Sequence, residues 1–267
     1  MVKVISARDN FCAEDGVLAA GTDWSVTKKT LVGGLQQGVE ILQVDNGKMQ
    51  FDVILTRGMS VGSITCGQIR LGWDSPVQQI VHPMFVNQQD DGGLGWLSGF
   101  NECMVRCGVS FAGQPGEDAG IPLTLHGRIA NTPASEVEVI VEEQSQPRIR
   151  IRGLVSERVF KFGSFDLWTE VSTVVGSRQV GFHDLVNSLA IRTSRTGLMK
   201  ISVDFATVHL RRASKGIPNR IMDHANVVHV HQEDQENDTG ADEHPDQHPA
   251  DHADSTESDL GLFLVVL

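Results

Sequence analysis

The sequence lacks the patterns that mark several large classes of protein. Its cysteines form no C-x-x-C pair and show no zinc-site spacing, so we expect the four of them to be free thiols: Cys12, Cys66, Cys103 and Cys107. No apolar run approaches the ~20 residues of a membrane-spanning helix. Residues 1–11 have neither the apolar run nor the small-residue cleavage site of a secretory signal. These absences predict a soluble, cytoplasmic protein that does not enter a membrane.

Basic residues are also few. The chain has 22 Lys and Arg against 34 Asp and Glu, for a formal net charge of −12. Eleven of the acidic residues, and no basic ones, lie within residues 232–259, so the rest of the chain is close to neutral. No basic stripe suggests contact with nucleic acid, and we predict no nucleic-acid partner.

Residues 224–259 are rich in His, Asp, Glu, Gln and Ala and have no apolar periodicity. Such a segment cannot bury enough surface to offset the loss of chain entropy, so we predict a disordered acidic tail over residues 211–267. Histidines such as His229 and His231 could bind a divalent metal loosely. Because no fixed ligand spacing occurs, we favour a solvated tail and predict no metal site.

What the chain does have is a succession of short apolar stretches separated by turn residues. Residues 39–44 and 49–55 read as strands, and Asp45-Asn46-Gly47 between them is typical of a hairpin turn. We also expect strands at 135–141, 148–155 and 199–210, and strand and loop rather than helix over the glycine-broken residues 94–109. Many short strands without a long amphipathic helix predict one all-β sandwich domain over residues 1–210.

The stretch from residue 92 to 131 combines apolar runs and glycines with polar side chains, and includes Leu125-His126-Gly127-Arg128. We predict that it lines a sugar-binding groove. A histidine has an unperturbed pKa near 6.5 and suits proton transfer, and an arginine can donate to two hydroxyls at once. A hydrogen bond from His126 to a neighbouring loop is the structural alternative.

Several short motifs occur along the chain in the order and spacing that are typical of one protein family. The chain from about residue 33 to 187 resembles the branch of the aldose 1-epimerase (galactose mutarotase-like) superfamily catalogued as a domain of unknown function, DUF4432. The motifs are Gly33-Gly34-Leu35, Val44-Asp45-Asn46-Gly47, Thr56-Arg57-Gly58-Met59, Leu71-Gly72-Trp73, Val81-His82-Pro83, Gly93-Leu94-Gly95-Trp96-Leu97 and Leu125-His126-Gly127-Arg128-Ile129. The resemblance implies a β-supersandwich with a sugar groove on its concave face.

The resemblance also implies an activity. Mutarotation needs a general acid for the ring oxygen and a general base for the anomeric hydroxyl, and it needs no metal or cofactor. His126 matches the first histidine of the superfamily's groove, so we assign it a catalytic or assisting role. Arg57 and Arg128 are expected to contact sugar hydroxyls, with His82 at the rim. A surface or ion-pair role for Arg57 and for Arg128, and a loop role for His82, are the structural alternatives.

Two tryptophans within these motifs, Trp73 and Trp96, could stack on a sugar ring, although core packing is the commoner role. The superfamily's second histidine and its carboxylate base are not recognisable after about residue 189, so we expect the C-terminal part to be truncated or divergent. His209 could replace the histidine by position alone. Glu102 could replace the base, although a solvent-exposed Glu102 is the simpler interpretation.

Two functions therefore remain open. One is an aldose 1-epimerase-like isomerase that acts on a small-molecule sugar. The other is a non-catalytic carbohydrate-binding relative, or a degenerate truncated copy, that lacks the second histidine and the Glu base.

Overall fold

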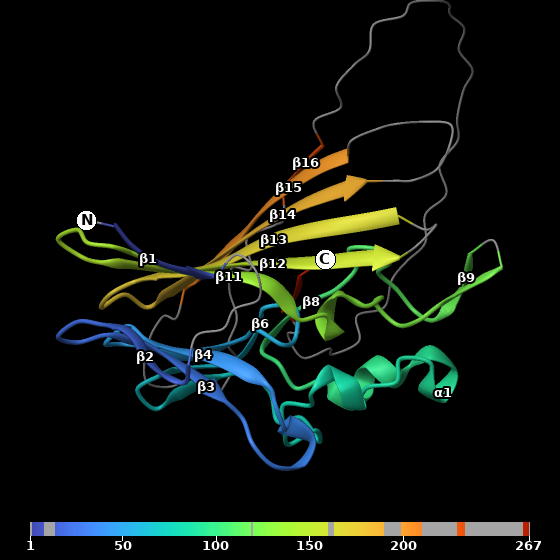
Figure 1. The fold of residues 1–267 in the computed structure, drawn as a ribbon, viewed down its shortest axis with the longest axis horizontal. Coiled ribbons are helices and arrows are strands. Elements are labelled where there is room, and N and C mark those ends of the chain that lie inside the picture. Colours follow the sequence, from blue (N-terminus) through green and yellow to red (C-terminus); the bar gives the residue numbers. More distant parts are fainter. Residues whose placement is uncertain are drawn as a thin grey trace, which may run out of the picture.

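A computed structural model describes residues 2–7, 14–118, 120–159, 163–189, 199–209, 229–232 and 264–266. Strands dominate it, and they form two large sheets that pack face to face (Figure 1). The predicted all-β sandwich is therefore confirmed. The helical elements are short: α1 (Asp90–Gly93) and the 3-10 turns η1 (Gly34–Gln36), η2 (Pro83–Phe85), η3 (Gly95–Gly99) and η4 (Ile129–Asn131).

The seven-stranded sheet has the order β1-β11-β12-β13-β14-β15-β16, with every neighbouring pair antiparallel. Its strands are β1 (Val2–Ala7), β11 (Ala134–Glu142), β12 (Arg148–Val159), β13 (Gly163–Val174), β14 (Gln179–Leu189), β15 (Met199–His209) and β16 (His229–Gln232). From β11 to β15 each strand pairs with the next along the chain, so this part is a simple meander.

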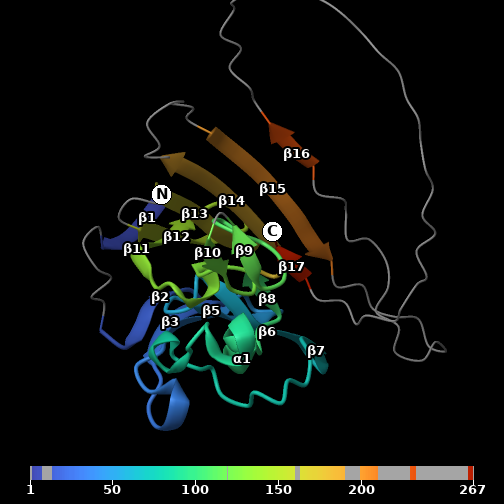
Figure 2. The same cartoon turned by 90° about the vertical axis from the view of Figure 1, so that its right-hand side faces the viewer.

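The eight-stranded sheet has the order β17-β8-β6-β5-β4-β3-β2, and β7 pairs with β6. Its strands are β2 (Gly16–Ala20), β3 (Ser25–Thr30), β4 (Glu40–Asp45), β5 (Gln50–Ile54), β6 (Ser60–Cys66), β7 (Ile69–Leu71), β8 (Met104–Arg106) and β17 (Leu264–Val266). Strand β17 runs parallel to β8, whereas the other pairs are antiparallel. A separate hairpin, β9 (Gly116–Asp118) and β10 (Ile121–Leu123), lies with α1 at one end of the sandwich (Figures 1 and 2).

The core lies between the two sheets because alternate side chains of each strand point inward. In β12 the inward positions are Ile149, Ile151 and Val155, while the arginines between them face outward. These inward residues pack in one hydrophobic cluster with residues of the opposite sheet, such as Leu42 and Val53. Each of these five side chains is at most 1% exposed. Burial of one face of each sheet fixes the register of its strands, since a slip of one residue would turn the apolar row to solvent.

The predicted hairpin at Asp45-Asn46-Gly47 joins β4 and β5, and Gly47 adopts the positive φ (+83°) that the turn requires. Asn46 has a second role that its turn position does not reveal. Its fully buried amide donates to the Thr173 hydroxyl at 2.7 Å and to the Val174 and Ser177 carbonyls. The turn of one sheet is thereby tied to the β13–β14 turn of the other.

The expectation of strand and loop over residues 94–109 is partly wrong, because residues 95–99 form η3 before β8 begins. The expected strands at 135–141, 148–155 and 199–210 are confirmed as β11, β12 and β15. Strands β16 and β17 come from the segment predicted to be disordered, and the remainder of residues 211–267 lies outside the described residues. The predicted domain division, and the divergence expected after residue 189, therefore stay predictions.

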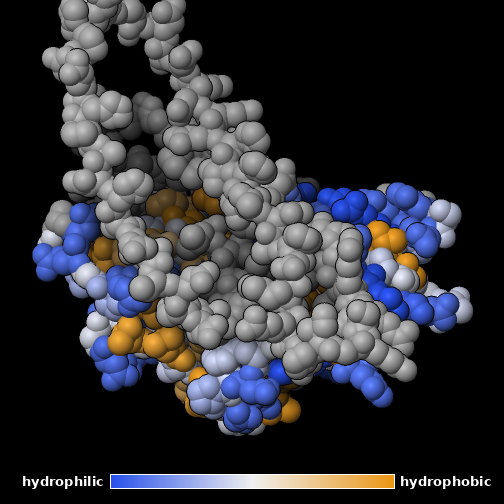
Figure 3. Space-filling view, turned by 180° about the vertical axis from the view of Figure 1, so that it is seen from behind, coloured by the Kyte–Doolittle hydropathy of each residue, from blue (hydrophilic) through white to orange (hydrophobic). Residues whose placement is uncertain are grey.

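The surface is mixed in character. Figure 3 shows hydrophobic side chains reaching one face in patches among hydrophilic ones. Among the residues that the structure describes, the most exposed large apolar ones are Met84 (72%), Val32 (71%) and Val17 (65%). In the part of the chain that the structure describes, no helix is long and apolar enough to cross a membrane.

Candidate functional site

His126 lies in the loop between β10 and η4, at the end of the sandwich that carries α1. Its backbone is left-handed (φ +55°), an uncommon conformation for a residue with a side chain. Two hydrogen bonds hold it there: its amide donates to the Gly113 carbonyl at 3.1 Å, and its carbonyl accepts from the Gly108 amide at 3.2 Å. Such strain persists only where the surroundings over-determine the conformation, and it is concentrated at functional sites.

The imidazole of His126 is half-buried and meets the Trp96 ring edge-on, with 5.2 Å between ring centroids. Burial lowers the pKa of His126, so the ring is neutral at neutral pH. Its Nδ1 is buried and has no hydrogen-bond partner among the described residues. A neutral imidazole can accept a proton on its unprotonated ring nitrogen, which is the chemistry of a general base.

The aromatic contacts continue away from His126, because Trp96 packs on Phe100 (4.7 Å) and Phe100 packs on Trp73 (5.0 Å). Trp96 is 2% exposed and belongs to the core, so it cannot serve as a sugar platform. Trp73 is half-buried and lines an open pocket with Arg70 and Asn101. The alternative of a core role is thus confirmed for Trp96.

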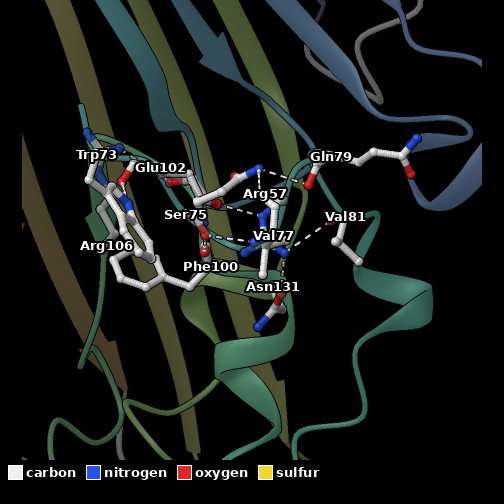
Figure 4. Close-up of polar contacts among 12 residues, drawn as sticks. Arg57, Trp73, Ser75, Val77, Gln79, Val81, Phe100, Glu102, Arg106 and Asn131 are labelled. Carbon is white, nitrogen blue, oxygen red and sulfur yellow. Dashed lines mark hydrogen bonds and ion pairs between the residues drawn. The ribbon is translucent and has the colours of Figure 1, made fainter. Parts of the chain in front are cut away.

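Arg57 is fully buried and forms an ion pair with Glu102 (Figure 4). Of the two structural alternatives, a surface role and an ion-pair role, the structure therefore shows the ion pair. Its Nε donates to Glu102 at 2.6 Å, and one terminal nitrogen donates to the Val81 carbonyl at 3.1 Å and to Asn131 Oδ1 at 2.8 Å. The expectation of an exposed Glu102 is wrong, since this residue is 1% exposed. An enclosed guanidinium cannot reach a sugar at the surface, so we reassign Arg57 from the predicted sugar contact to a buried structural pair.

Arg128 is exposed, and its positive charge acts on Glu157 of β12. Glu157 is 7% exposed and accepts a hydrogen bond from the Ser110 hydroxyl. Burial raises the pKa of the Glu157 carboxyl, against the smaller opposing effects of the Ser110 hydrogen bond and the Arg128 charge. Its Oε1 is buried and has no partner within the described part of the chain.

Gly127 joins the His126 loop to the Glu157 side of the site. It has φ +67°, and a Cβ there would lie 3.0 Å from the Phe111 carbonyl oxygen and 3.1 Å from the Ser110 hydroxyl. Only glycine allows this close approach without displacing Ser110, whose hydroxyl bonds to Glu157. The loop that carries His126 and Arg128 therefore packs directly on the hydroxyl that holds Glu157.

His82 lies apart from these contacts, in the loop that leads into η2. Its Nδ1 accepts a hydrogen bond from the Met84 amide at 3.1 Å, which caps η2, and its ring meets Phe85 edge-on at 6.5 Å. These contacts correspond to the loop role that was its structural alternative. The predicted place of His82 at the rim of a sugar groove stays a prediction.

A second buried ion pair, Arg106–Asp184, joins the two sheets. Arg106 of β8 donates to both carboxylate oxygens of Asp184 on β14, at 2.9 and 3.2 Å, and also to the Met59 carbonyl. The Thr169 hydroxyl donates to the same carboxylate. Arg106 and Asp184 are both buried, and because β8 and β14 belong to different sheets, this ion pair joins the two sheets.

Glu157 and Asp184 were not predicted from the sequence, but the alternation of side chains along their strands contains a signal for both. In β12 the inward positions alternate from Ile149 through Val155, and the same parity places Glu157 on the inner face. Likewise Phe182 and Asp184 share a face of β14. A charged residue in an inward position is uncommon and merits a functional interpretation. His209, the suggested substitute for the second histidine, lies on β15, where its backbone alone is described.

The arrangement offers proton transfer and hydrogen bonding as its chemistry. No group of three or more His, Cys, Asp or Glu side chains that could hold a metal ion occurs among the described residues. Burial raises the pKa of Cys103 to about 11 and of Cys107 to about 12, so neither thiol is a nucleophile at neutral pH.

Comparison with known proteins gives two findings. A family model described as a domain of unknown function, DUF4432, matches residues 36–199. The structure is similar to the crystal structure of a putative aldose 1-epimerase from Klebsiella pneumoniae subsp. pneumoniae MGH 78578, with a TM-score of 0.66 and 36% sequence identity. The match covers 76% of this chain and 55% of that one, so the chain spans about half the length of that protein. No curated protein matches the chain.

Proposed function

The chain belongs to the DUF4432 family, as its motifs predicted, and on this premise we propose that it binds a sugar where His126, Arg128 and Glu157 lie and interconverts the sugar's anomers. The similarity to a protein described as a putative aldose 1-epimerase supports a carbohydrate-related function. The observation that carries the proposal is Glu157, a carboxyl on the inner face with one buried oxygen that has no partner among the described residues.

The electrostatics of the site support a division of labour between two groups. Burial raises the pKa of the Glu157 carboxyl and lowers that of the His126 imidazole. The carboxyl is therefore biased toward its protonated form and the imidazole toward its neutral form. A protonated carboxyl is a general acid and a neutral imidazole is a general base.

The proposed reaction needs no outside reactant. His126 takes the proton from the anomeric hydroxyl while Glu157 donates its proton to the ring oxygen, so the ring C–O bond breaks as the carbonyl forms. The open-chain aldehyde rotates about its C1–C2 bond. The imidazolium then returns its proton to the carbonyl oxygen, the carboxylate takes back the hydroxyl proton, and the ring closes with both side chains restored.

Arg128 supplies the binding role in this proposal. Its guanidinium is exposed beside Glu157 and can donate to two adjacent sugar hydroxyls. The Arg128 charge also limits the rise in the Glu157 pKa, so the carboxyl can release a proton as well as hold one.

The proposal is tested by NMR exchange between the anomers of aldoses such as glucose and galactose. We expect the protein to accelerate exchange, and Glu157→Gln to lower the acceleration about 10²- to 10⁴-fold, the usual contribution of a general acid. Glu143→Gln is the matched control, because Glu143 is an exposed residue just after β11. The control should retain the full rate.

The outcomes separate the two functions. Sugar binding without acceleration would identify a carbohydrate-binding relative that is not an enzyme. Acceleration that survives Glu157→Gln unchanged would remove Glu157 from the mechanism, and absence of both binding and acceleration would refute the proposed function.

A further inference from the structure

Arg57 connects four segments that are distant in the sequence (Figure 4). Its guanidinium bonds to the carboxylate of Glu102, to the Val81 carbonyl and to the Asn131 side chain. Glu102 in turn accepts from the Asn101 amide at 3.0 Å through its other oxygen. A fully buried ion pair with this many directed bonds has one geometry only, and it transmits that geometry to each segment it holds.

One of the four segments carries the proposed site. Asn131 is the last residue of η4, which follows Arg128 directly, and the amide of Asn131 closes this turn on the Arg128 carbonyl at 2.8 Å. The neighbouring backbone is anchored at the same place, because the Gly58 amide donates to the Thr132 carbonyl at 2.9 Å. A Cβ on Gly58 would lie 2.5 Å from the Ile129 carbonyl oxygen, so the two backbones touch.

The loop needs such an anchor. His126 and Gly127 are consecutive left-handed residues, and the left-handed conformation is intrinsically unfavourable for a residue with a side chain. Backbone hydrogen bonds to Gly108 and Gly113 fix the N-terminal side of the loop. On the C-terminal side three side chains hold the loop. Gln88 donates to the Gly127 carbonyl and Thr132 to the Arg128 carbonyl, and the charged group among the three is Arg57, which donates to Asn131.

We infer that the buried Arg57–Glu102 pair is a positioning device, which sets the place of His126 and Arg128 through its hydrogen bond to Asn131. The inference rests on the proposed site for the meaning of that placement, but the coupling itself can be measured without a sugar. Arg57 is thus a positioning residue rather than a sugar contact.

Asn131 is the position at which to test the coupling, because changing it leaves the buried ion pair intact. Asn131→Ala removes the acceptor for Arg57. Asn131→Asp keeps an oxygen acceptor for Arg57. The substitution removes only the Nδ2 donor, which has no hydrogen-bond partner among the described residues, so it should lose no other bond. Asn101→Ala is the matched control: it removes the bonds from the Asn101 side-chain amide to the Val77 and Gln79 carbonyls and keeps the backbone amide that donates to Glu102.

The first readout is NMR of the sugar-free protein. In Asn131→Ala we expect a shifted Hε1 resonance of His126. We also expect roughly 10- to 100-fold faster exchange of the Asn131 and Thr132 amides, the size expected when a hydrogen bond to a charged group is lost. Asn131→Asp should resemble the wild type, and Asn101→Ala should leave these signals in place. Thermal unfolding confirms that each variant is folded.

The second readout is the kinetics of anomer exchange, where misplacement of the loop should lower kcat/KM by roughly 10- to 100-fold, because His126 and the sugar-binding Arg128 are displaced together. Unchanged NMR signals in Asn131→Ala would overturn the inference, and so would equal losses in the Ala and Asp variants. Shifted signals in a protein that shows no turnover would uphold the coupling and refute the proposed function instead.

Discussion

Replacing Asp184 by Asn should lower the free energy of unfolding by about 3–5 kcal/mol, because it leaves the Arg106 guanidinium buried without a countercharge. The structure gives the reason for so large an effect. The two side chains are 2% and 6% exposed, they meet through Nε at 2.9 Å, and they join strands of different sheets. Water cannot replace the lost carboxylate without opening the sandwich.

A change of this size is easy to detect by calorimetry or by circular dichroism. For a domain of this length about 1 kcal/mol corresponds to 2–4 °C in Tm, so we expect a decrease of roughly 6–20 °C. Arg106→Met should act similarly, because it leaves the carboxylate of Asp184 buried and unpaired. Arg158→Met is the control: its partner is Asp166, the pair is 59% and 33% exposed, and a surface pair contributes about 0–1 kcal/mol.

The double variant Arg106→Met/Asp184→Leu tests the physical argument. Replacing both charges with apolar groups removes the desolvation cost together with the attraction, so the double variant should be more stable than either single variant. A double variant whose loss equals the sum of the two single losses would show no coupling and would refute the reasoning.

Two further predictions concern Glu157 and Asn46. Because burial raises the folded-state pKa of Glu157 above its unfolded value of about 4.5, the folded protein binds the proton more tightly and loses stability as pH rises through the window between those two values. Glu157→Gln should therefore be more stable than wild type at pH 7 and lose that advantage below pH ~4.5 in denaturant titrations, and an advantage that is the same at every pH would contradict the assigned cause. Asn46→Ala should cost about 2–4 kcal/mol, since it removes the donor to the Thr173 hydroxyl and leaves the buried Met49 amide without its acceptor. A loss below about 1 kcal/mol in urea unfolding would show that the tie between the two turns is dispensable.

The division between sequence and structure is clear at Asn46. The Asn-Gly pair predicts the hairpin because turn chemistry is local, and Gly47 alone takes the positive φ. The bond from Asn46 to Thr173 joins residues 127 positions apart, so no local rule contains it. Glu157 is an intermediate case, since the alternation of β12 places it inward but does not say what faces it.

Arg57 and Glu102 show most directly what could not be predicted from the sequence. Their residue types suggested a sugar ligand and an exposed carboxylate, and the fold buried both in one ion pair with 2.6 Å between the bonded atoms. The sequence by itself determined the strands, the turns and the sandwich, because side-chain alternation and turn propensity act over a few residues. Only the tertiary structure decided which charges meet, because desolvation and ion pairing depend on neighbours that distant segments supply.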